Sequence, residues 1–261
     1  LGGRSEILIL EAGVGGEFDS TNGFAKELLV VTKISKDHTD MLGETLFEIA
    51  KTKLAASNCK TVIAKQEFAK EVKSAATALK ITYESAPDSV DESETAKIQK
   101  HIKDKAFPSY LAENLLTAYV AAKHFLPSPD ISSAVPPCYR FFRYKKNIIL
   151  DVGHNVDAAK AVQKELGDTK ITLVFNSYAD KNPIESLEIL KPSIQNVLIL
   201  PIEAKRAVKI EILTEILDKI GVSYKEFDGV DDSKDYLVFG SFAVVAEFLR
   251  RGRSEEHTSE L

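Results

Sequence analysis

Two segments near the start of the chain combine glycine, carboxylate and imidazole groups in a pattern that suits phosphate and metal chemistry. Glu11 directly follows the apolar run at residues 7–10, and a glycine-rich stretch comes next at 13–16. His38 follows a second apolar stretch, residues 28–35, in the same way. Glycines let the backbone approach a ligand closely. A carboxylate and an imidazole that share one crevice can hold a divalent cation beside a phosphate.

These side chains can act together only if two strands position them. Short apolar runs bounded by turn residues predict buried, parallel strands at 7–10 and 28–35. Ligands of open α/β sheets bind beyond the carboxyl ends of the strands, so neighbouring strands would bring Glu11 and His38 to one crevice. Each feature also has a plainer explanation, because the glycines can form a tight turn, Glu11 can be a solvated strand end, and His38 can be an ordinary loop histidine.

The composition is that of a globular protein and excludes several other classes. Hydrophobic residues make up 44% and charged residues 28% of the chain, as in soluble domains. The net charge of −5 argues against a nucleic-acid surface, and no apolar run is long enough for a membrane-spanning helix. Cys59 and Cys138 are too few for a disulfide framework. With no visible signal peptide, this predicts a protein of the reducing cytoplasm.

Hydrophobic periodicity predicts the remaining elements of the first half. It places helices at 44–56, 67–79 and 111–125, and strands at 61–65 and 81–84. Residues 85–105 are polar and charged, which predicts surface structure. Four prolines and three serines then gather between residues 126 and 137. That composition is typical of a linker between domains, which we expect at 127–137.

The second half of the chain alternates between strands and helices. The predicted strands are 147–151, 170–175, 196–200 and 235–239, with a further one at 223–227, and the predicted helices are 156–166, 184–190, 210–220 and 242–250. This alternation implies right-handed crossovers and a parallel sheet. Polar groups follow three of the strands, with Asp151 to Asn155 after the first, Asp180 and Lys181 after the second, and Gly240 and Ser241 after the last. Their recurrence favours a site at one sheet edge, although each alone is also a routine turn.

The motifs EAGVGGEFDSTN at 11–22 and ISKDHTDMLGETLFEIAKTKLA at 34–55 resemble those of a known family. They are similar to the central motifs of the folylpolyglutamate synthase and dihydrofolate synthase family, within the Mur ligase superfamily of ATP-dependent amide ligases. The similarity continues to about Arg250. It implies an α/β fold, with a partial P-loop-type central domain at 1–126 followed by a Rossmann-like C-terminal domain with a mostly parallel sheet at 138–252.

The resemblance implies catalytic and metal-binding roles for three residues. Glu11 and His38 match the positions that hold Mg²⁺ in the family. Lys53 lies on the helix predicted at 44–56, where the family carries a carbamylated lysine, so the carbamate would add an anion beside the metal and phosphate. Without the resemblance, Lys53 reads as a solvated helix lysine.

The resemblance also implies a nucleotide site. Asn114, near the start of a predicted helix, matches an asparagine that reaches the adenine of ATP. Asp151 and His154, in the segment IILDVGHN, match residues beside the nucleotide and its phosphates. Arg140 matches an arginine that the C-terminal domain brings onto ATP, where a guanidinium stabilises charge on the transferring phosphoryl group. Without the resemblance, Asn114 can be explained as a capping or surface amide, Asp151 as part of an Asx turn, and Arg140 as an ordinary surface arginine.

The segment FDST matches the family's substrate-binding residues beside the pterin, which implies this role for Phe18, Asp19, Ser20 and Thr21. Two positions depart from the family pattern. Glu17 stands where many members have arginine, which reverses a charge next to the substrate. The family's G-R-x-E around the nucleotide arginine is replaced here by YRFF at 139–142, which weakens the assignment of Arg140.

The reaction that the resemblance implies joins L-glutamate to dihydropteroate or folate. ATP phosphorylates a substrate carboxylate, and the amino group of glutamate attacks the acyl phosphate. The protein's task is positioning and charge neutralisation. We expect Mg²⁺ as cofactor and a monomer that binds ATP, L-glutamate and dihydropteroate or folate, with no nucleic-acid or membrane partner.

The ends of the chain suggest that it derives from a longer protein. It starts without methionine, and residues 253–261, RSEEHTSEL, resemble the translation of a sequencing adaptor, so we expect a non-native tail there. No G-x-x-x-x-G-K-[ST] phosphate loop is present. The family carries one upstream of the matched region, so we expect truncation, and we expect this chain alone to be inactive.

Two alternatives to a folate ligase remain open on the sequence. Related forms of the glycine motif and of the lysine after His38 occur across the superfamily, so a ligase that acts on a peptidoglycan precursor is the first alternative. The pairing of FDSTN with DVGHN favours folate. The second is a nucleotide-binding relative that has kept the fold and lost catalysis.

Overall fold

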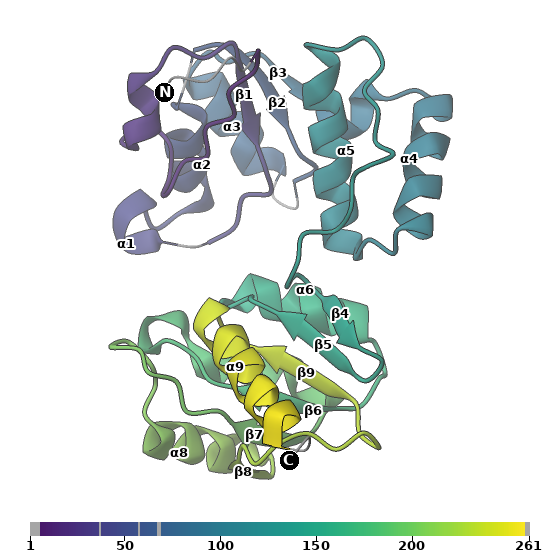
Figure 1. Cartoon of the computed structure of the whole chain (residues 1–261). Helices are drawn as coiled ribbons and strands as arrows, with labels where there is room; N and C mark the ends of the chain where they lie inside the picture. The colour runs from purple at the N-terminus through teal and green to yellow at the C-terminus, as the bar shows by residue number, and fades with distance from the viewer. Residues whose placement is uncertain (1–5, 37, 57, 67–68, 259–261) are drawn as a thin grey trace. The chain divides into compact units, whose positions relative to one another are not determined.

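The computed structural model describes residues 6–36, 38–56, 58–66 and 69–258 of the chain. The chain divides into two compact units, residues 1–134 and 135–261 (Figure 1). Each unit is an α/β structure with its own sheet, and all strand pairs but one are parallel. The predicted α/β class is therefore confirmed. In the part of the chain described, no helix is both long and apolar enough to cross a bilayer.

The first unit is built on a small parallel sheet. Its strands, in the order β1-β2-β3, are β1 (Leu28–Val31), β2 (Lys60–Ile63) and β3 (Tyr83–Ser85). Its helices are α1 (Thr39–Leu42), α2 (Leu46–Leu54), α3 (Ala69–Ala78), α4 (Glu92–Asp104) and α5 (Ser109–Lys123), with short 3-10 turns η1 (Ser20–Gly23) and η2 (Ala86–Ser89).

Alternation along the strands gives this sheet two apolar faces. Val31 and Ile63 join a core with residues of α2 and α3, such as Ile49 and Val72. On the other face, Val62 packs with residues of α5. The helix α4 packs beside α5 and buries little of its own surface. The predicted polar segment 85–105 is thus mainly a helix, started by a capping box between Asp91 and Glu94.

The expected strand at 7–10 is not formed, and this expectation was wrong. Residues 7–10 have no strand assignment and pair with none of the described strands. The exposed fractions are 48% for Ile7, 58% for Leu8 and 88% for Ile9. An apolar run becomes a buried strand only if neighbouring strands satisfy its backbone groups and helices cover its faces. The described part of the first unit supplies neither to residues 7–10.

The second unit contains the larger sheet, with strand order β4-β5-β9-β6-β7-β8. The strands are β4 (Phe142–Lys145), β5 (Ile148–Asp151), β6 (Ile171–Phe175), β7 (Ile194–Ile199), β8 (Tyr224–Glu226) and β9 (Tyr236–Phe239). The helices are α6 (Val156–Leu166), α7 (Pro183–Leu190), α8 (Ile210–Ile220) and α9 (Phe242–Thr258), with 3-10 turns η3 (Ala179–Lys181) and η4 (Lys191–Ser193). Only β4, an edge strand that the periodicity did not predict, is antiparallel.

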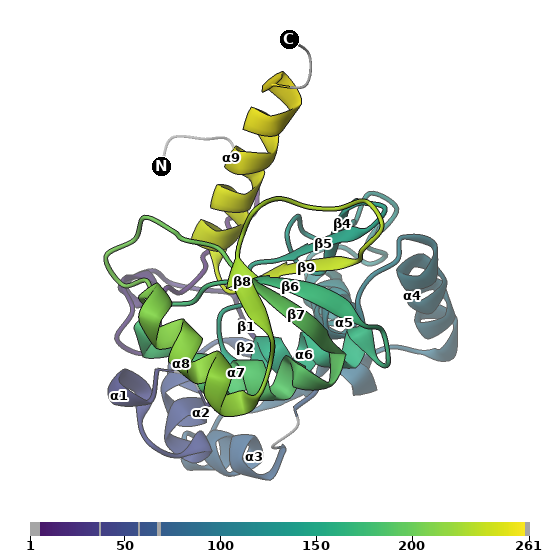
Figure 2. The same cartoon turned by 90° about the horizontal axis from the view of Figure 1, so that it is seen from below.

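Helices cover both faces of this sheet (Figure 2). One core joins the sheet to α6, α7 and α8, and includes Ile149, Leu187 and Leu217. The opposite core joins it to α9, and includes Leu150 and Val244. The central strands β5, β6 and β9 are buried on both sides, which explains why they are largely apolar, whereas the edge strands β4 and β8 are more exposed and more polar.

Candidate functional site

The glycine-rich loop at 13–16 packs directly against α1 and α2. A β-carbon on Gly15, which has a φ of +73°, would lie 2.6 Å from Leu42 Cδ2. One on Gly16 would lie 2.7 Å from Ala56 Cβ and 3.1 Å from the carbonyl oxygen of Lys53. Glycine at 16 is therefore required by close packing, and glycine at 15 is favoured by its left-handed backbone conformation.

Asp19 organises this loop through its carboxylate. Oδ2 accepts hydrogen bonds from the backbone N–H groups of Gly13 (2.8 Å) and Val14 (3.2 Å). Oδ1 accepts from the backbone N–H (2.9 Å) and hydroxyl (2.7 Å) of Thr21. These bonds favour the charged form, those from Thr21 most, and lower the pKa of Asp19 from 3.8 to about 2. The carboxylate therefore holds Thr21, at the end of the FDST segment, together with the glycine loop.

The other residues of the proposed substrate segment differ in exposure. Phe18 is 86% exposed, although its aromatic ring would normally be buried. Ser20 is also exposed and begins η1, for which Asp19 is the N-cap. An exposed ring beside this turn is available to a ligand.

Lys26 is a component of this region that the sequence reasoning missed. Its ammonium donates to the side-chain oxygen of Asn22 (3.3 Å) and to the carbonyl oxygens of Phe24 (3.1 Å) and Ala56 (3.1 Å). It thereby ties the turn after Asp19 to the end of α2. A single lysine in a loop carries no sequence signal that could have indicated this role.

Glu11 and His38 are not brought together by neighbouring strands, so that expectation was wrong. Glu11 is exposed and follows the unpaired residues 7–10. His38 precedes α1 with a left-handed φ of 52°, and its carbonyl oxygen accepts from the N–H groups of Met41 and Leu42, both at 2.9 Å. Within the described ranges, no three or more His, Cys, Asp and Glu residues cluster to hold a metal.

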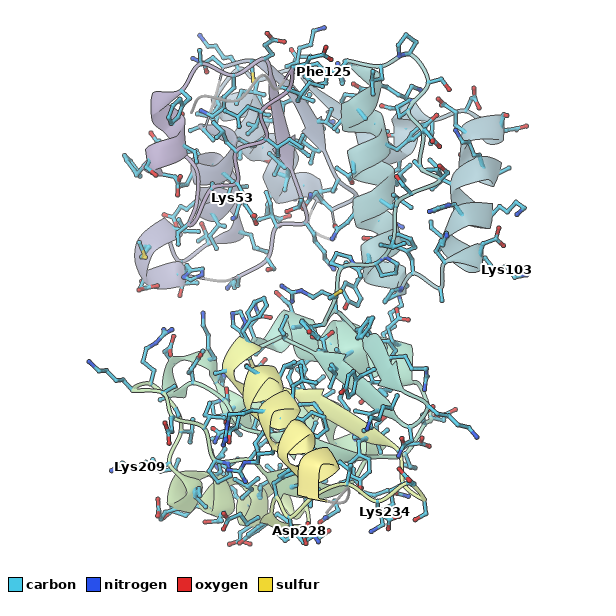
Figure 3. All side chains as sticks on the ribbon, viewed as in Figure 1. Lys53, Lys103, Phe125, Lys209, Asp228 and Lys234 are labelled. Carbon is cyan, nitrogen blue, oxygen red and sulfur yellow. The ribbon has the colours of Figure 1, made fainter. Side chains whose placement is uncertain are left out.

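Lys53 and Asn114 lie on two different helices of the first unit. Lys53 (Figure 3) is partly buried in the last turn of α2, beside the glycine loop whose Glu17 N–H donates to the Thr52 carbonyl oxygen at 3.1 Å. Asn114 is exposed on α5. The predicted helices for both residues are present, so each has a fixed backbone position.

In the second unit, Asp151 is buried at the carboxyl end of β5. It is 1% exposed, and its Oδ1 accepts from the Gly153 N–H at 2.6 Å. Its Oδ2 accepts from the Phe141 N–H at 2.8 Å. The structure thus uses this carboxylate to hold two backbone segments that lie ten residues apart in the chain. The sequence indicated an Asx turn at Asp151, but it carried no signal for the hydrogen bond from the Phe141 N–H.

Arg140 lies in the turn that Asp151 holds. Its neighbours Tyr139 and Phe141 have left-handed φ values of 62° and 49°, which are unfavourable for aromatic residues. The turn is stabilised by the bond from Asp151 and by the Val152 N–H, which donates to the Tyr139 carbonyl oxygen at 2.9 Å. Arg140 and Asp151 are therefore coupled through the backbone.

His154 and Asn155 follow in the loop before α6. His154 Nδ1 lies 3.4 Å from the Val152 carbonyl oxygen. Asn155 is the N-cap of α6, and its side-chain oxygen accepts from the Ala158 N–H at 2.9 Å. The start of this helix points N–H groups and a positive dipole toward the loop, which is an arrangement suited to an anion.

The carboxyl ends of β5, β9 and β6 adjoin in this unit, because these parallel strands are neighbours. The Gly240 N–H donates to the Gly153 carbonyl oxygen at 3.0 Å. A β-carbon on Gly240, whose φ is +135°, would lie 1.8 Å from the carbonyl oxygen of Asn176. Glycine at 240 thus allows three loops to converge at the edge where the sequence predicted a site.

Asp180 belongs to a second part of this edge. Its carboxylate lies 3.5 Å from an Arg206 nitrogen, and the Arg206 guanidinium stacks over the Tyr178 ring at 4.7 Å from its centroid. The Ala179 N–H donates to the Arg206 carbonyl oxygen at 3.0 Å. Arg206, which no motif indicated, therefore fixes the loop that carries Asp180 and Lys181.

Comparison with known proteins identifies the relatives of this chain. No family model matches it. A dihydrofolate synthase/folylpolyglutamate synthase of Buchnera aphidicola (subsp. Schizaphis graminum) is 27% identical, over 94% of this chain and 66% of the relative. The Escherichia coli protein of the same name is 25% identical, over 94% and 64%. The Helicobacter pylori folylpolyglutamate synthetase structure matches with 34% identity and a TM-score of 0.63, over 94% of this chain and 65% of that one. The chain is related to the dihydrofolate synthase/folylpolyglutamate synthases.

These synthases are Mur-type ligases, and the fold of this chain agrees with theirs. The structure titled E. coli FolC in complex with DHPP and ADP matches with a TM-score of 0.74 over 95% of this chain, at 22% identity, which supports the common fold alone. The chain spans 66% of the length of the Buchnera synthase and 64% of that from E. coli. The resemblance of its motifs to this family is thus confirmed.

Proposed function

We propose that the chain functions in the ATP-dependent addition of L-glutamate to dihydropteroate, to folate, or to both. The observation that carries this proposal is the similarity to folylpolyglutamate synthases along 94% of the chain. In this reaction ATP phosphorylates the substrate carboxylate, and the glutamate amino group displaces phosphate from the acyl phosphate. The products are the amide, ADP and phosphate.

Charge neutralisation in the first unit is assigned to Glu11, His38 and Lys53. The Glu11 carboxylate suits Mg²⁺, a hard cation that takes few protein oxygen ligands and keeps waters and phosphate oxygens as its others. His38 is assigned to the same site from the family resemblance, because an imidazole nitrogen is not a ligand that Mg²⁺ prefers. When bound, Mg²⁺ would offset charge on the phosphate oxygens. Lys53, as a carbamate, would add an anion beside it. A bifunctional folylpolyglutamate synthase/dihydrofolate synthase of similar fold has been solved with Mn, AMPPNP and L-glutamate bound.

Substrate binding is assigned to Phe18, Asp19, Ser20 and Thr21. Asp19 acts by holding the loop, since its carboxylate oxygens already accept four hydrogen bonds. The exposed ring of Phe18 offers an apolar surface to a flat pterin. Ser20 and Thr21 supply hydroxyl groups on the same turn.

Nucleotide binding is assigned to Asn114 in the first unit and to Arg140, Asp151 and His154 in the second. The guanidinium of Arg140 would stabilise charge on the transferring phosphoryl group. Asp151 would position Arg140 through the Phe141 N–H. His154 lies at the start of α6, where backbone N–H groups favour phosphate.

We expect that the 261-residue chain by itself does not turn over ATP. Its sequence contains no G-x-x-x-x-G-K-[ST] loop to cradle the phosphates. The measurement is ADP release by the purified chain with dihydropteroate, L-glutamate and Mg²⁺. ATP-dependent ligation by this chain would contradict the expectation.

The function is tested with the product of the gene that encodes this chain, including any codons upstream of Leu1. The assay compares dihydropteroate or folate plus L-glutamate with a muramyl nucleotide plus an amino acid. Glutamylation of the pterin substrate, lost in Lys53→Gln and Arg140→Ala, is expected. Ligation to the muramyl nucleotide alone would assign a peptidoglycan ligase. No ligation on either substrate would favour a non-catalytic relative.

A further inference from the structure

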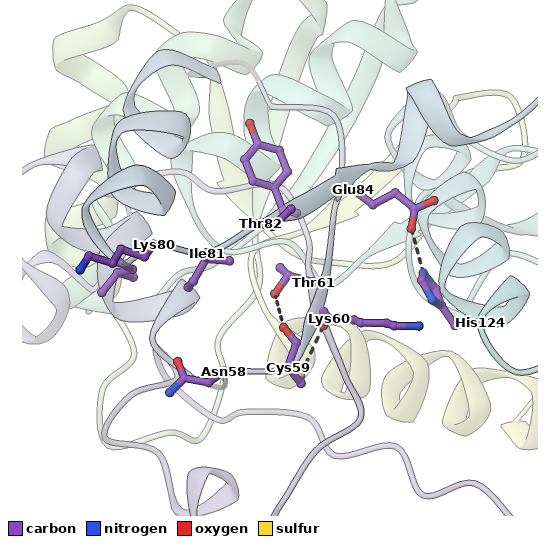
Figure 4. A pocket seen from close by; sticks show the side chains of 11 residues that line it. Asn58, Cys59, Lys60, Thr61, Lys80, Ile81, Thr82, Glu84 and His124 are labelled. Atoms are coloured by element: carbon purple, nitrogen blue, oxygen red, sulfur yellow. Dashed lines mark hydrogen bonds and ion pairs between the residues drawn. The ribbon is translucent and has the colours of Figure 1, made fainter.

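The first unit contains a pocket at the amino ends of β2 and β3. It has a volume of about 680 Å³, within the range of small-molecule sites. Figure 4 shows its walls, formed by residues 58–61 before and within β2, by residues 79–84 leading into β3, and by His124 after α5. The pocket contains none of the residues assigned above to nucleotide, metal or folate.

The charge of this pocket is positive and uncompensated. Lys60 and Lys80 line it, and neither ammonium has a hydrogen-bond or ion-pair partner within the described ranges. The acidic side chain in the lining, Glu84, is already bonded, because its Oε2 lies 2.8 Å from His124 Nε2. The pocket thus has two unpaired lysine ammonium groups, while its carboxylate is bonded to His124. This local positive charge contrasts with the net charge of −5 of the chain.

The lining of the pocket is mixed in polarity. Thr61 is 3% exposed, and its hydroxyl donates to the Cys59 carbonyl oxygen at 3.2 Å. The Cys59 thiol lies 3.3 Å from the Lys60 carbonyl oxygen. Ile81 and Leu79 add apolar surface. A ligand that fits has an anionic group for the lysines and a small carbon skeleton.

We propose that this pocket binds a small organic anion with a carboxylate or phosphate group. Lys60 and Lys80 neutralise the anion from two sides of the pocket, with Lys60 on the side of the Glu84–His124 pair and Lys80 on the other (Figure 4). The pocket stands at the amino ends of the strands, so its occupancy does not depend on the proposed ligase reaction. A failure of either proposal leaves the other standing.

Cys59 provides a direct test, because it lies inside the pocket. The full chain carrying Cys138→Ser has a single thiol, since the sequence holds two cysteines. Its alkylation by neutral iodoacetamide is followed at constant ionic strength with added succinate, glycerol phosphate or 1,4-diaminobutane. We expect succinate, glycerol phosphate or both to slow alkylation at concentrations up to about 10 mM. The diamine should have no effect. Protection by one anion alone identifies the group that the pocket prefers.

Matched variants separate specific binding from general screening. Lys60→Gln and Lys80→Gln should each weaken protection about threefold, as for an exposed charge contact. Lys73→Gln removes an exposed cation from α3, outside the pocket, and should leave protection unchanged. The proposal is overturned if neither anion protects Cys59, if the diamine protects equally, or if all three variants behave alike. Thermal unfolding of each variant verifies that it is folded.

Discussion

Two aspartates, Asp19 and Asp151, do similar work in the two units. Each belongs to a motif that the family resemblance links to ligand binding. In each, the carboxylate oxygens accept hydrogen bonds from backbone N–H groups. The geometry therefore assigns each aspartate to the shape of the loops in its own unit. Substitution of either aspartate should change the conformation of its loop, and should affect ligand binding only through that change.

The pH dependence of the glycine loop follows from the pKa of Asp19. The folded pKa of about 2 lies below the ordinary value of 3.8. The carboxylate therefore stabilises the loop fully above about pH 4, and this contribution is lost as the pH falls through 2. We expect the NMR amide shifts of Gly13, Val14 and Thr21 to titrate with a midpoint near 2. In Asp19→Asn this titration should be missing, and a midpoint near 3.8 in the native chain would contradict the assignment.

Asp151→Asn should destabilise the second unit by about 1–3 kcal/mol, because the amide cannot accept from both N–H groups and one of them is left buried without a partner. Urea unfolding followed by circular dichroism measures the effect. Asp157→Asn is the control, since the Asp157 side chain is 42% exposed and its carboxylate lies 3.7 Å from the Lys160 ammonium. Equal midpoints for the two variants would show that the buried bonds of Asp151 carry little energy.

At the scale of elements, the carboxyl edge of the second sheet depends on close approach of its loops. β9 stands between β5 and β6, and the chain leaves it through Gly240 into α9. The sequence pattern around Gly240 does not by itself require a glycine there. In the folded chain, however, the Asn176 carbonyl oxygen occupies the space that a β-carbon on residue 240 would need. The close approach of the segments that follow β6 and β9 therefore depends on one glycine.

Gly240→Ala should lower the stability of the second unit by more than about 3 kcal/mol, because alanine at this φ is strained and also overlaps a backbone oxygen. The thermal unfolding midpoint measures this loss. Gly252→Ala is a suitable control, as nothing lies within 4 Å of its position on α9 and alanine favours a helix. A midpoint for Gly240→Ala like that of the control would contradict the close approach.

At the scale of the whole molecule, each unit has its own apolar core. The buried clusters of the described residues draw their members either from residues before 134 or from residues after 135. No cluster mixes members from the two. Each unit should therefore respond to a core substitution by itself.

We expect Ile49→Ala, at a fully buried position, to cost the first unit about 2–5 kcal/mol. Hydrogen exchange measured by mass spectrometry should increase in α2 and β2 and stay unchanged in β5, β6 and β9. Leu237→Ala, buried in β9, should show the reverse pattern. Equal increases in both units after either substitution would indicate one cooperative unit.

The sequence alone determined the elements whose signals are local. The predicted bounds of α6 and α8 equal the observed ones, because an amphipathic period fills each segment and a glycine, Gly167 or Gly221, follows its last residue. The apolar runs of the second half likewise predicted its parallel strands, and the motifs indicated the family. These features depend on residues that are neighbours along the chain.

Tertiary structure alone decided which of these segments acquire partners. Residues 7–10 have the composition of a buried strand, yet they stay unpaired, because burial depends on strands and helices supplied elsewhere. The partner of Asp151 across ten residues and the close approach at Gly240 likewise arise only after folding. The presence of both Lys60 and Lys80 in the lining of one pocket also arises only after folding. The physical reason is that hydrogen bonds, packing and charge act through space, and only the folded chain defines which distant groups are near.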